Sequence, residues 1–504
     1  MVRFYANLYL CVAVVHLFLA GTHVLKAQAP AASAPDIVLR GDVKGAQAQT
    51  YIEVPFQVPA GVQRVTLTFT YTEKQQHTAL DLGLLDPTQL RCWSGGNKSM
   101  LTVGLSDATP SCLPGVLPAG TWNLLIGVPN IRAGVTSHYT AQVFFTRSGL
   151  VSDEPTALRA PLRVGPAWYR GDLHMHTAHS DGQCPSQTGK IVPCPVFFTV
   201  DAAARRGLDF IAVTDHNATS HYDDLRELQP YFDKVLLIPG REITTFQAHL
   251  NFLGSTQFLD FRLGSETVPE MDVLLRNAQK LDALVSINHP LAPTGEVCMG
   301  CGWTPNPPAD MSLLNAVEAV NGGSEDDVFS GIPFWEQKLD EGYRLTAIGG
   351  SDNHRPMTPL DQHGSIGRPT TVVWASELST PAILAAIRAG HVFIDLMGTS
   401  DRILEFTGSA NGTVAHMGDD LSASSQAQVS FEVHVVGAAA GQVVILQDGK
   451  PLSGAVAAPV DGQPFRASWT SDGRRHWFRA DLIGPDRKIL LLGNPIYLNW
   501  DIGR

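Results

Sequence analysis

The sequence predicts a mixed α and β protein in which a parallel β/α region lies between two β regions. At 504 residues the chain is too long for one ordinary core, because single domains usually stop growing at about 250–300 residues. Short runs with two-residue alternation fill its first and last parts, whereas apolar runs alternate with helix-length segments in the middle. We therefore expect a signal peptide at 1–29, an N-terminal β-sandwich domain at 36–148, a linker at 149–168, a β/α domain at 169–398 and a C-terminal β domain at 399–504.

The first residues have the order of a secretory signal. Arg3 precedes an apolar run at 8–20, and the small-residue sequence Ala27-Gln28-Ala29 follows. The run is shorter than the roughly 20 apolar residues that span a bilayer. We expect a periplasmic or secreted protein with no membrane span after signal removal; an uncleaved anchor is the alternative.

The N-terminal β region contains alternating runs at 65–70 and 139–144, separated by Gly, Pro and Asn. This pattern predicts a β-sandwich. Three prolines within 152–166 indicate the linker that follows.

In the middle region, apolar runs at 210–213, 235–238, 283–287 and 345–348 predict buried strands. Intervening amphipathic segments at 200–206, 271–280 and 381–389 predict helices. Strands and helices in alternation imply a parallel β/α architecture. From about residue 401 the two-residue alternation returns, at 429–433 and then at 489–492, which predicts the C-terminal β domain.

Six cysteines remain after the expected signal, and they form three close pairs in the sequence: Cys92 and Cys112, Cys184 and Cys194, Cys298 and Cys301. An even count in an exported chain indicates disulfides. The last two pairs could also cross-connect, or together hold a structural zinc ion.

Candidate metal ligands follow the predicted strands of the middle region. In β/α barrels the carboxyl ends of the strands meet on one face, so these side chains are expected to converge. They are His174, His176, Asp181, His216, Glu242, His249, His289, Asp352 and His354.

The kind of ligand indicates the kind of ion. Imidazole and carboxylate without thiolate suit Zn, Mn or Fe better than Mg or Ca. His174 and His176 lie on the same side of an extended segment and can reach one cation. Nine candidates exceed what one ion could take, so we expect two or three divalent metal ions.

The ordered motifs resemble those of the PHP (polymerase and histidinol phosphatase) superfamily. They are His174-Met175-His176-Thr177 with Ser180-Asp181-Gly182, Thr214-Asp215-His216-Asn217, Gly240-Arg241-Glu242, Asn288-His289-Pro290 and Ser351-Asp352-Asn353-His354. The elements His249-Leu250-Asn251 and Asn494-Pro495-Ile496-Tyr497 resemble more narrowly the branch that includes bacterial carbaryl hydrolases. The motifs cover about 169–354.

The resemblance implies a distorted, TIM-like (β/α)₇ barrel flanked by N-terminal and C-terminal β-sandwich domains. By analogy, His174, His176 and Asp352 hold one ion, and Glu242 bridges to a second that His249 and His289 complete. Asp181, His216 and His354 hold the third. A metal-bridging water or hydroxide, held by Glu242, Asp352 and His174, is the expected nucleophile.

Three further residues flank these ligands. Asp215 is expected to orient His216 without binding metal itself. Arg241 and Arg355 are candidates to hold an anionic substrate, with ordinary ion pairs as the alternative.

With 48 acidic and 36 basic residues the formal charge is −12, and no basic stripe is present, which disfavours general nucleic-acid binding. The expected partner is a small-molecule ester. Hydrolysis of a phosphoester is the first hypothesis, hydrolysis of a carbamate or carboxylic ester the second, and an inactive binding scaffold the third. The natural substrate, the metal, the role of the β domains and the oligomeric state stay open.

Overall fold

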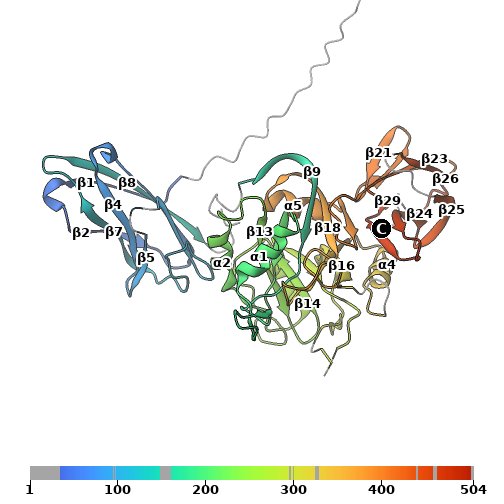
Figure 1. Cartoon of the computed structure of the whole chain (residues 1–504), viewed down its shortest axis with the longest axis horizontal. Coiled ribbons are helices and arrows are strands. Elements are labelled where there is room, and N and C mark those ends of the chain that lie inside the picture. The colour runs from blue at the N-terminus through green and yellow to red at the C-terminus, as the bar shows by residue number, and fades with distance from the viewer. Residues whose placement is uncertain are drawn as a thin grey trace, which may run out of the picture. The chain divides into compact units, whose positions relative to one another are not determined.

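The computed structural model is rich in strands and has five α-helices among its described residues (Figure 1). It describes residues 34–94, 96, 98–147, 160–294, 297–298, 300–323, 328–438, 441–457 and 463–500. The chain from Asp36 onward forms one compact unit. The expected signal peptide lies outside the described residues. Within those residues no helix has the length and apolar character needed to cross a membrane.

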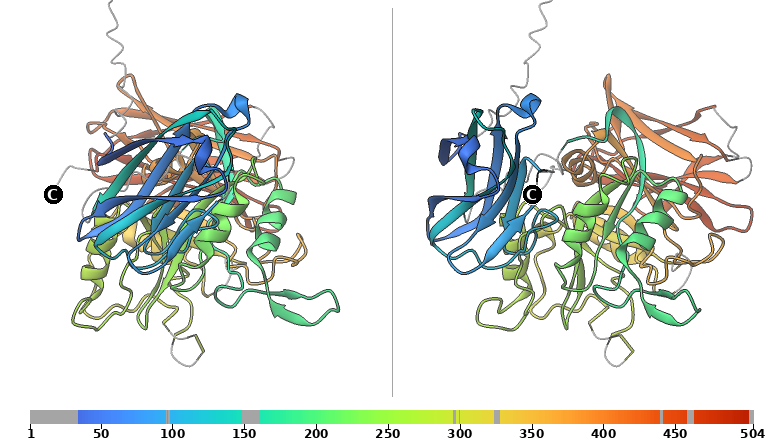
Figure 2. Two further views of the ribbon diagram at one scale, coloured as in Figure 1. Left: turned by 90° about the vertical axis from the view of Figure 1, so that its left-hand side faces the viewer. Right: turned by 60° about the vertical axis from the view of Figure 1, so that its left-hand side comes forward.

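The N-terminal β region consists of two antiparallel four-stranded sheets (Figure 2). Side chains from both sheets share one hydrophobic core that includes the fully buried Trp122. One sheet has the order β1 (Ile37–Lys44), β8 (Thr136–Arg147), β3 (Val62–Tyr71) and β6 (Met100–Gly104). The other has the order β2 (Tyr51–Val58), β7 (Gly120–Asn130), β4 (Ala79–Leu85) and β5 (Leu90–Trp93).

The middle region is built on one long mixed sheet. Its first eight strands in spatial order are β17 (Thr346–Gly350), β16 (Ala316–Asn321), β15 (Leu284–Ile287), β14 (His249–Leu253), β13 (Leu236–Thr244), β12 (Phe210–Val213), β9 (Arg163–Asp172) and β18 (Thr370–Leu378). Four of the seven neighbouring pairs are parallel, whereas β14 is antiparallel to both β13 and β15, and β18 is antiparallel to β9. Only 245–248 separate β13 from β14, which leaves no room for a crossover helix. The mixed α/β class holds, whereas a regular (β/α)₇ repeat is not confirmed.

The helices bury one face each. In α3 (Met271–Lys280) the buried residues recur at the helical spacing of three and four, at Met271, Leu274, Leu275 and Ala278. The start of α5 (Thr380–Arg388) is capped by Ser379, whose side chain accepts a hydrogen bond from the Ala382 amide. The others are α1 (Val196–Arg205), α2 (His221–Leu228) and α4 (Ile332–Glu341).

Hydrogen bonds also connect the chain after β17, the first strand of this order, to the chain after β9. Beyond β9 and β17 the chain forms a parallel bridge between Met175 and Asn353, in which the His176 amide donates to the Asn353 carbonyl at 2.8 Å. Farther back, the Asn494 side chain bonds both backbone groups of Ala347 at 2.8 and 2.9 Å. The same amide donates to the Val392 carbonyl at 2.9 Å, so Asn494 joins β17 to the segment that begins at Val392.

The C-terminal β region is joined to the middle region by strand pairing. Through β19 (Val392–Asp395), the long sheet continues to β28 (Ile489–Gly493), β27 (His476–Ile483), β24 (Gln442–Gln447) and β25 (Lys450–Ala457). A separate sheet of β21 (Thr413–His416), β20 (Ile403–Ala410), β23 (Gln428–Val436) and β26 (Phe465–Thr470) shares a core with them. The short strands β22 (Asp420–Leu421) and β29 (Ile496–Leu498) pair with each other. The predicted boundary at 399 therefore does not separate two sheets.

The predicted linker ends too late. Strand β9 begins at Arg163, because the chain pairs with β18 from there onward in spite of Gly165 and Pro166. Residues 149–159 of the linker lie outside the described residues.

The cysteines pair locally, as Cys92–Cys112, Cys184–Cys194 and Cys298–Cys301. The second pair joins β10 (Gln183–Pro185) to the segment just after β11 (Ile191–Pro193). Neither the crossed pairing nor a four-thiol zinc site is present.

Candidate metal centre

All nine predicted ligands lie in groups that could hold a metal ion. Within each group of three or four, the ligand atoms are within 4.8 Å of one another. The side chains come from segments at the carboxyl ends of β9, β12, β13, β15 and β17 and from the start of β14. The groups share members, so they form one continuous cluster. Its residues are His174, His176, Asp181, His216, Glu242, His249, His289, Asp352 and His354.

The Glu242 carboxylate lies at the centre of the cluster and is fully buried. Five imidazole nitrogens surround it: His216 at 2.8 Å, His249 at 3.2 Å, His289 at 3.3 Å, His174 at 3.4 Å and His176 at 3.6 Å. Burial alone would raise the pKa of Glu242, but the neighbouring histidines hold it well below its usual range. Glu242 is thus an anion, and its two oxygens could contact more than one cation.

The Asp352 carboxylate, which follows β17, faces two of these histidines. Its Oδ1 lies 3.3 Å from His174 Nε2 and 3.2 Å from His176 Nε2. Backbone φ is +51° at Asp352 and +27° at His289, in the left-handed region that most side chains avoid. Such conformations cost free energy and concentrate at functional sites.

The outer part of the cluster is open to solvent. The Asp181 side chain is 55 % exposed, and its Oδ1 lies 3.3 Å from His354 Nε2 and 3.9 Å from His216 Nε2. The hydrogen bond from His354 lowers the pKa of Asp181 to about 2. Burial lowers the pKa of His354, but the bond to Asp181 and the charge of Asp352 together raise it to about 9.

Unsatisfied atoms inside the cluster show that the residues fit divalent ions. His174 Nε2 and Glu242 Oε2 are buried, and among the described residues neither makes a hydrogen bond of good geometry, although His216 Nδ1 lies 2.8 Å from Glu242 Oε2. An unpaired buried polar atom costs about 1–3 kcal/mol, which coordination of a cation would offset. Cys301 lies beside His249 and His289, but its sulfur is in a disulfide. The available donors are therefore nitrogen and oxygen, the set that suits Zn, Mn or Fe.

A buried carboxylate that the sequence analysis missed holds His174 in place. Glu318 Oε1 lies 2.7 Å from His174 Nδ1, and its Oε2 accepts a bond from the His289 amide at 3.2 Å. This bond places the proton of His174 on Nδ1 and leaves Nε2 as the ligand atom. A Cβ at Gly350 would overlap Glu318 Oε1 and His174 Cβ, so this packing requires glycine. The sequence feature that could have pointed to Glu318 is that it is a single glutamate inside the apolar strand Ala316–Asn321.

Asp172, also missed, ties three backbone segments together. Its carboxylate accepts hydrogen bonds from the amides of His174 at 3.2 Å, Ser351 at 3.1 Å and Gly367 at 2.7 Å. Burial raises the pKa of this carboxyl. The ends of β9 and β17 and the loop before β18 are thereby held around the cluster.

Asp215 has a different role from the one expected. Its carboxylate accepts hydrogen bonds from the Thr177 amide at 2.7 Å and the Ser180 hydroxyl at 2.6 Å, and so holds the turn that carries Asp181. His216 points elsewhere, because consecutive residues in extended chain face opposite sides. Its Nδ1 lies 2.6 Å from the Thr244 hydroxyl.

The two arginines next to ligands differ. Arg241 is fully buried on the other face of β13 from Glu242, where Nη2 donates to the Gln257 carbonyl at 2.7 Å. Its guanidinium lies 5.0 Å from the Phe252 ring centroid. The expectation that Arg241 contacts substrate is therefore wrong. Arg355 is exposed and stays a candidate.

No family model and no curated protein matches the chain. Among solved structures, the chain is similar to a two-domain protein from Bacteroides vulgatus that contains a predicted PHP-like metal-dependent phosphoesterase. The likeness has a TM-score of 0.37 and 19 % identity, and covers 68 % of this chain and 100 % of that one. A second, PsfC from Pseudomonas syringae, has a TM-score of 0.27 and 18 % identity, and covers 44 % of this chain and 87 % of that one.

Proposed function

We propose that this chain is an exported, PHP-type metal-dependent hydrolase that cleaves an ester bond, with a phosphoester as the first candidate. The observation that carries the proposal is the buried Glu242 carboxylate, which is surrounded by five imidazole nitrogens and has an oxygen that makes no hydrogen bond of good geometry among the described residues. Such an arrangement is costly unless cations complete it.

The chain's own residues hold and orient the centre. Glu242 and Asp352 each face at least two histidines, and can hold two ions side by side. Glu318 fixes the tautomer of His174. Divalent ions bound here would supply Lewis-acid chemistry and lower the pKa of a coordinated water from 15.7 to about 7. Asp181 and His354, at the open edge, would hold a third ion where substrate enters.

Export is supported by the signal-like start of the sequence and by three disulfides, which are typical of oxidising compartments. An inactive scaffold is disfavoured, because its signature would be a missing ligand and all nine candidates are present.

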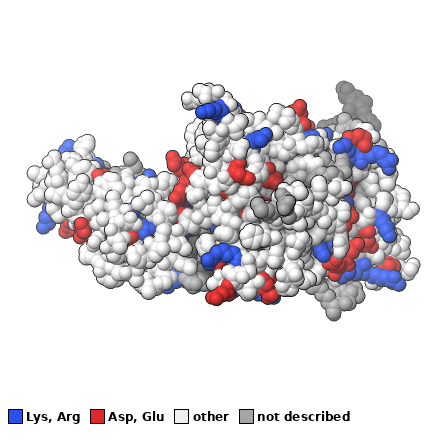
Figure 3. Space-filling view, turned by 90° about the horizontal axis from the view of Figure 1, so that it is seen from below, with Lys and Arg blue, Asp and Glu red and all other residues white. Residues whose placement is uncertain are grey.

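A carbamate or carboxylic ester is the second candidate substrate, and exposed apolar side chains favour it. They lie on loops that follow strands β13, β15, β16 and β17, and the most exposed is Phe246 at 86 %. The others are Leu291, Val297, Val328, Phe329, Met357 and Leu360. On the face seen in Figure 3, lysines and arginines lie in separate small groups, several of them beside acidic residues, and most of the surface is uncharged. Apolar surroundings suit an aryl or alkyl ester better than a multiply charged phosphate.

Parallel assays would separate the candidates. The purified chain is tested on p-nitrophenyl phosphate, bis-p-nitrophenyl phosphate and 1-naphthyl methylcarbamate, with bound metal measured in the same preparation. We expect turnover that disappears on chelation and returns with Zn, Mn or Fe. Preference for either phosphate supports the first candidate, and preference for the carbamate the second. Metal-replete protein that is inert on all three substrates and on a broad ester panel contradicts the hydrolase proposal.

A further inference from the structure

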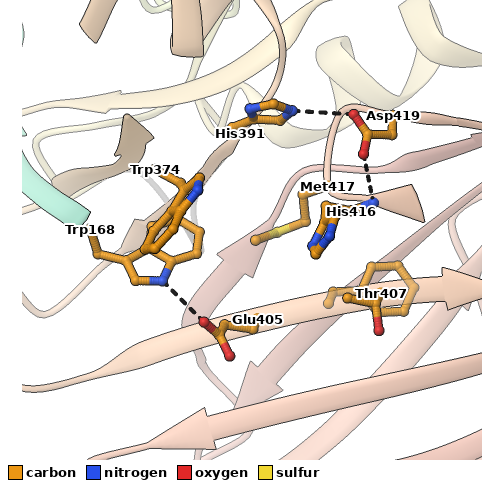
Figure 4. Close-up of a pocket in the computed structure, with 9 residues that line it drawn as sticks. Trp168, Trp374, His391, Glu405, Thr407, His416, Met417 and Asp419 are labelled. Atoms are coloured by element: carbon orange, nitrogen blue, oxygen red, sulfur yellow. Dashed lines mark hydrogen bonds and ion pairs between the residues drawn. The ribbon is translucent and has the colours of Figure 1, made fainter. Parts of the chain in front are cut away.

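A cavity of about 420 Å³ lies where strands β9 and β18 meet the C-terminal β region. Figure 4 shows its lining, which comes from β9, β18, the segment before β19, and strands β20 and β21 with the turn after them. None of the nine metal-ligand candidates is among the described residues that line it. Its size is in the range of small-molecule sites, about 300–1,000 Å³.

Two tryptophans form one wall of this cavity. Trp168 and Trp374 are paired across β9 and β18, with ring centroids 5.4 Å apart and planes tilted by 58°. Trp168 also packs edge-on against Phe393 at 5.1 Å, and its Nε1 donates to Glu405 at 3.3 Å. Trp374 is 41 % exposed although the residues before it in β18 are buried. The indole of Trp168 is therefore held in place, and that of Trp374 is exposed in the cavity wall.

The charged groups of this cavity are acidic. Glu405 and Asp419 are half-exposed carboxylates, and no lysine or arginine occurs among the described lining residues. The Trp168 indole N–H is committed to Glu405, and His391 Nε2 lies 3.2 Å from Asp419 Oδ1. Figure 4 shows both interactions at the edge of the cavity. Glu405 Oε2 also lies 3.2 Å from His434 Nδ1, and the lining further contains Thr407 and His416. Because its two carboxylates are not faced by a lysine or arginine of the described lining, the cavity favours a ligand that brings positive charge.

We propose that this cavity binds a small organic cation with a methylated ammonium group. The faces of tryptophan rings attract such cations, and cages of aromatic side chains are the usual way in which proteins recognise quaternary ammonium. Glu405 and Asp419 supply the balancing charge. A neutral sugar could also stack on an indole and meet the polar side chains of Thr407 and His416, but only a cation gains from the two carboxylates.

Isothermal titration calorimetry of the full, metal-loaded chain with choline chloride tests the proposal. Sodium chloride at equal ionic strength and glucose serve as comparison probes. We expect saturable binding of choline at one site and no binding of either comparison probe. Trp374→Ala should weaken choline binding about tenfold, because one aromatic face is lost, while Trp374→Phe should retain most of it. Glu405→Gln should weaken it several-fold.

Tyr231→Ala is the matched control, because Tyr231 is a 73 % exposed aromatic side chain outside this cavity. It should leave choline binding unchanged. Thermal unfolding and metal content verify that each variant is folded. Absence of choline binding by the wild-type chain overturns the proposal. So does choline binding that Trp374→Ala leaves intact, or binding of glucose that depends on Trp374.

Discussion

The candidate metal centre and the tryptophan cavity share strand β9, but their carboxylates differ in burial. His174 and His176 follow the carboxyl end of β9, whereas Trp168 lies within the strand and faces the C-terminal β region. In the metal centre Glu242 and Glu318 are fully buried among imidazoles. In the cavity Glu405 and Asp419 keep contact with water.

This difference predicts which groups depend on a bound cation. A buried charge that loses its partners is strongly destabilising, by about 3–5 kcal/mol, while a half-exposed charge is solvated and loses little. Substitutions of the buried charged groups in the centre should therefore change metal content and stability. Substitutions in the cavity should change neither.

The largest effect is expected for Glu242→Ala. Because this carboxylate faces five imidazole nitrogens, its removal should cost about two ions per chain and nearly all turnover. His391→Ala, in the tryptophan cavity, should keep full metal content. Metal analysis of both variants, purified in parallel, measures the contrast. Full metal content in Glu242→Ala would refute the bridging role.

Glu318→Gln should have an intermediate effect. Glutamine preserves the volume beside Gly350 but weakens the bond that orients His174, so metal affinity should fall about 10- to 100-fold. Competition with a chelator of known affinity measures this loss without reference to turnover. Glu405→Gln makes the same change in the cavity and should leave metal affinity unaltered. Equal affinities for all three proteins would show that Glu318 is only structural.

The smallest effect in the centre is expected for Asp181→Asn. This carboxylate is 55 % exposed and lies nearest to His354 at 3.3 Å, with His176 and His216 at 3.8 and 3.9 Å, so its loss should release about one ion and leave the others bound. Metal analysis gives the stoichiometry, and thermal unfolding should show little change. Loss of every ion would mean that the outer and inner groups are a single unit.

Local sequence patterns predicted much of the fold. The helix predicted at 271–280 has those bounds, and the strand predicted at 210–213 is β12. The spacing of apolar residues within each segment predicts the element, because that spacing depends on the local sequence alone. The end of the linker was misplaced because β9 gains its stability from pairing with β18, and that partner is about 200 residues away in the sequence.

The nine residues could be proposed as ligands because most of them come at or close to the end of an apolar run, and the structure brings all nine into one cluster. Glu318 could not, since it occurs within a strand, and only the approach of β16 to His174 reveals its role. Asp215 and Arg241 were misread for a related reason. Both stand beside a ligand in the sequence, and extended chain turns neighbouring side chains to opposite faces.

The sequence by itself was enough to name the candidate metal ligands, because ligand type and strand periodicity are local properties. Only the tertiary structure decided which of them share an ion site, which carboxylate orients His174, and that two tryptophans with two acids line a cavity. These features depend on contacts between segments far apart in the chain. Such contacts arise when strands pair and cores pack, and no local pattern records them.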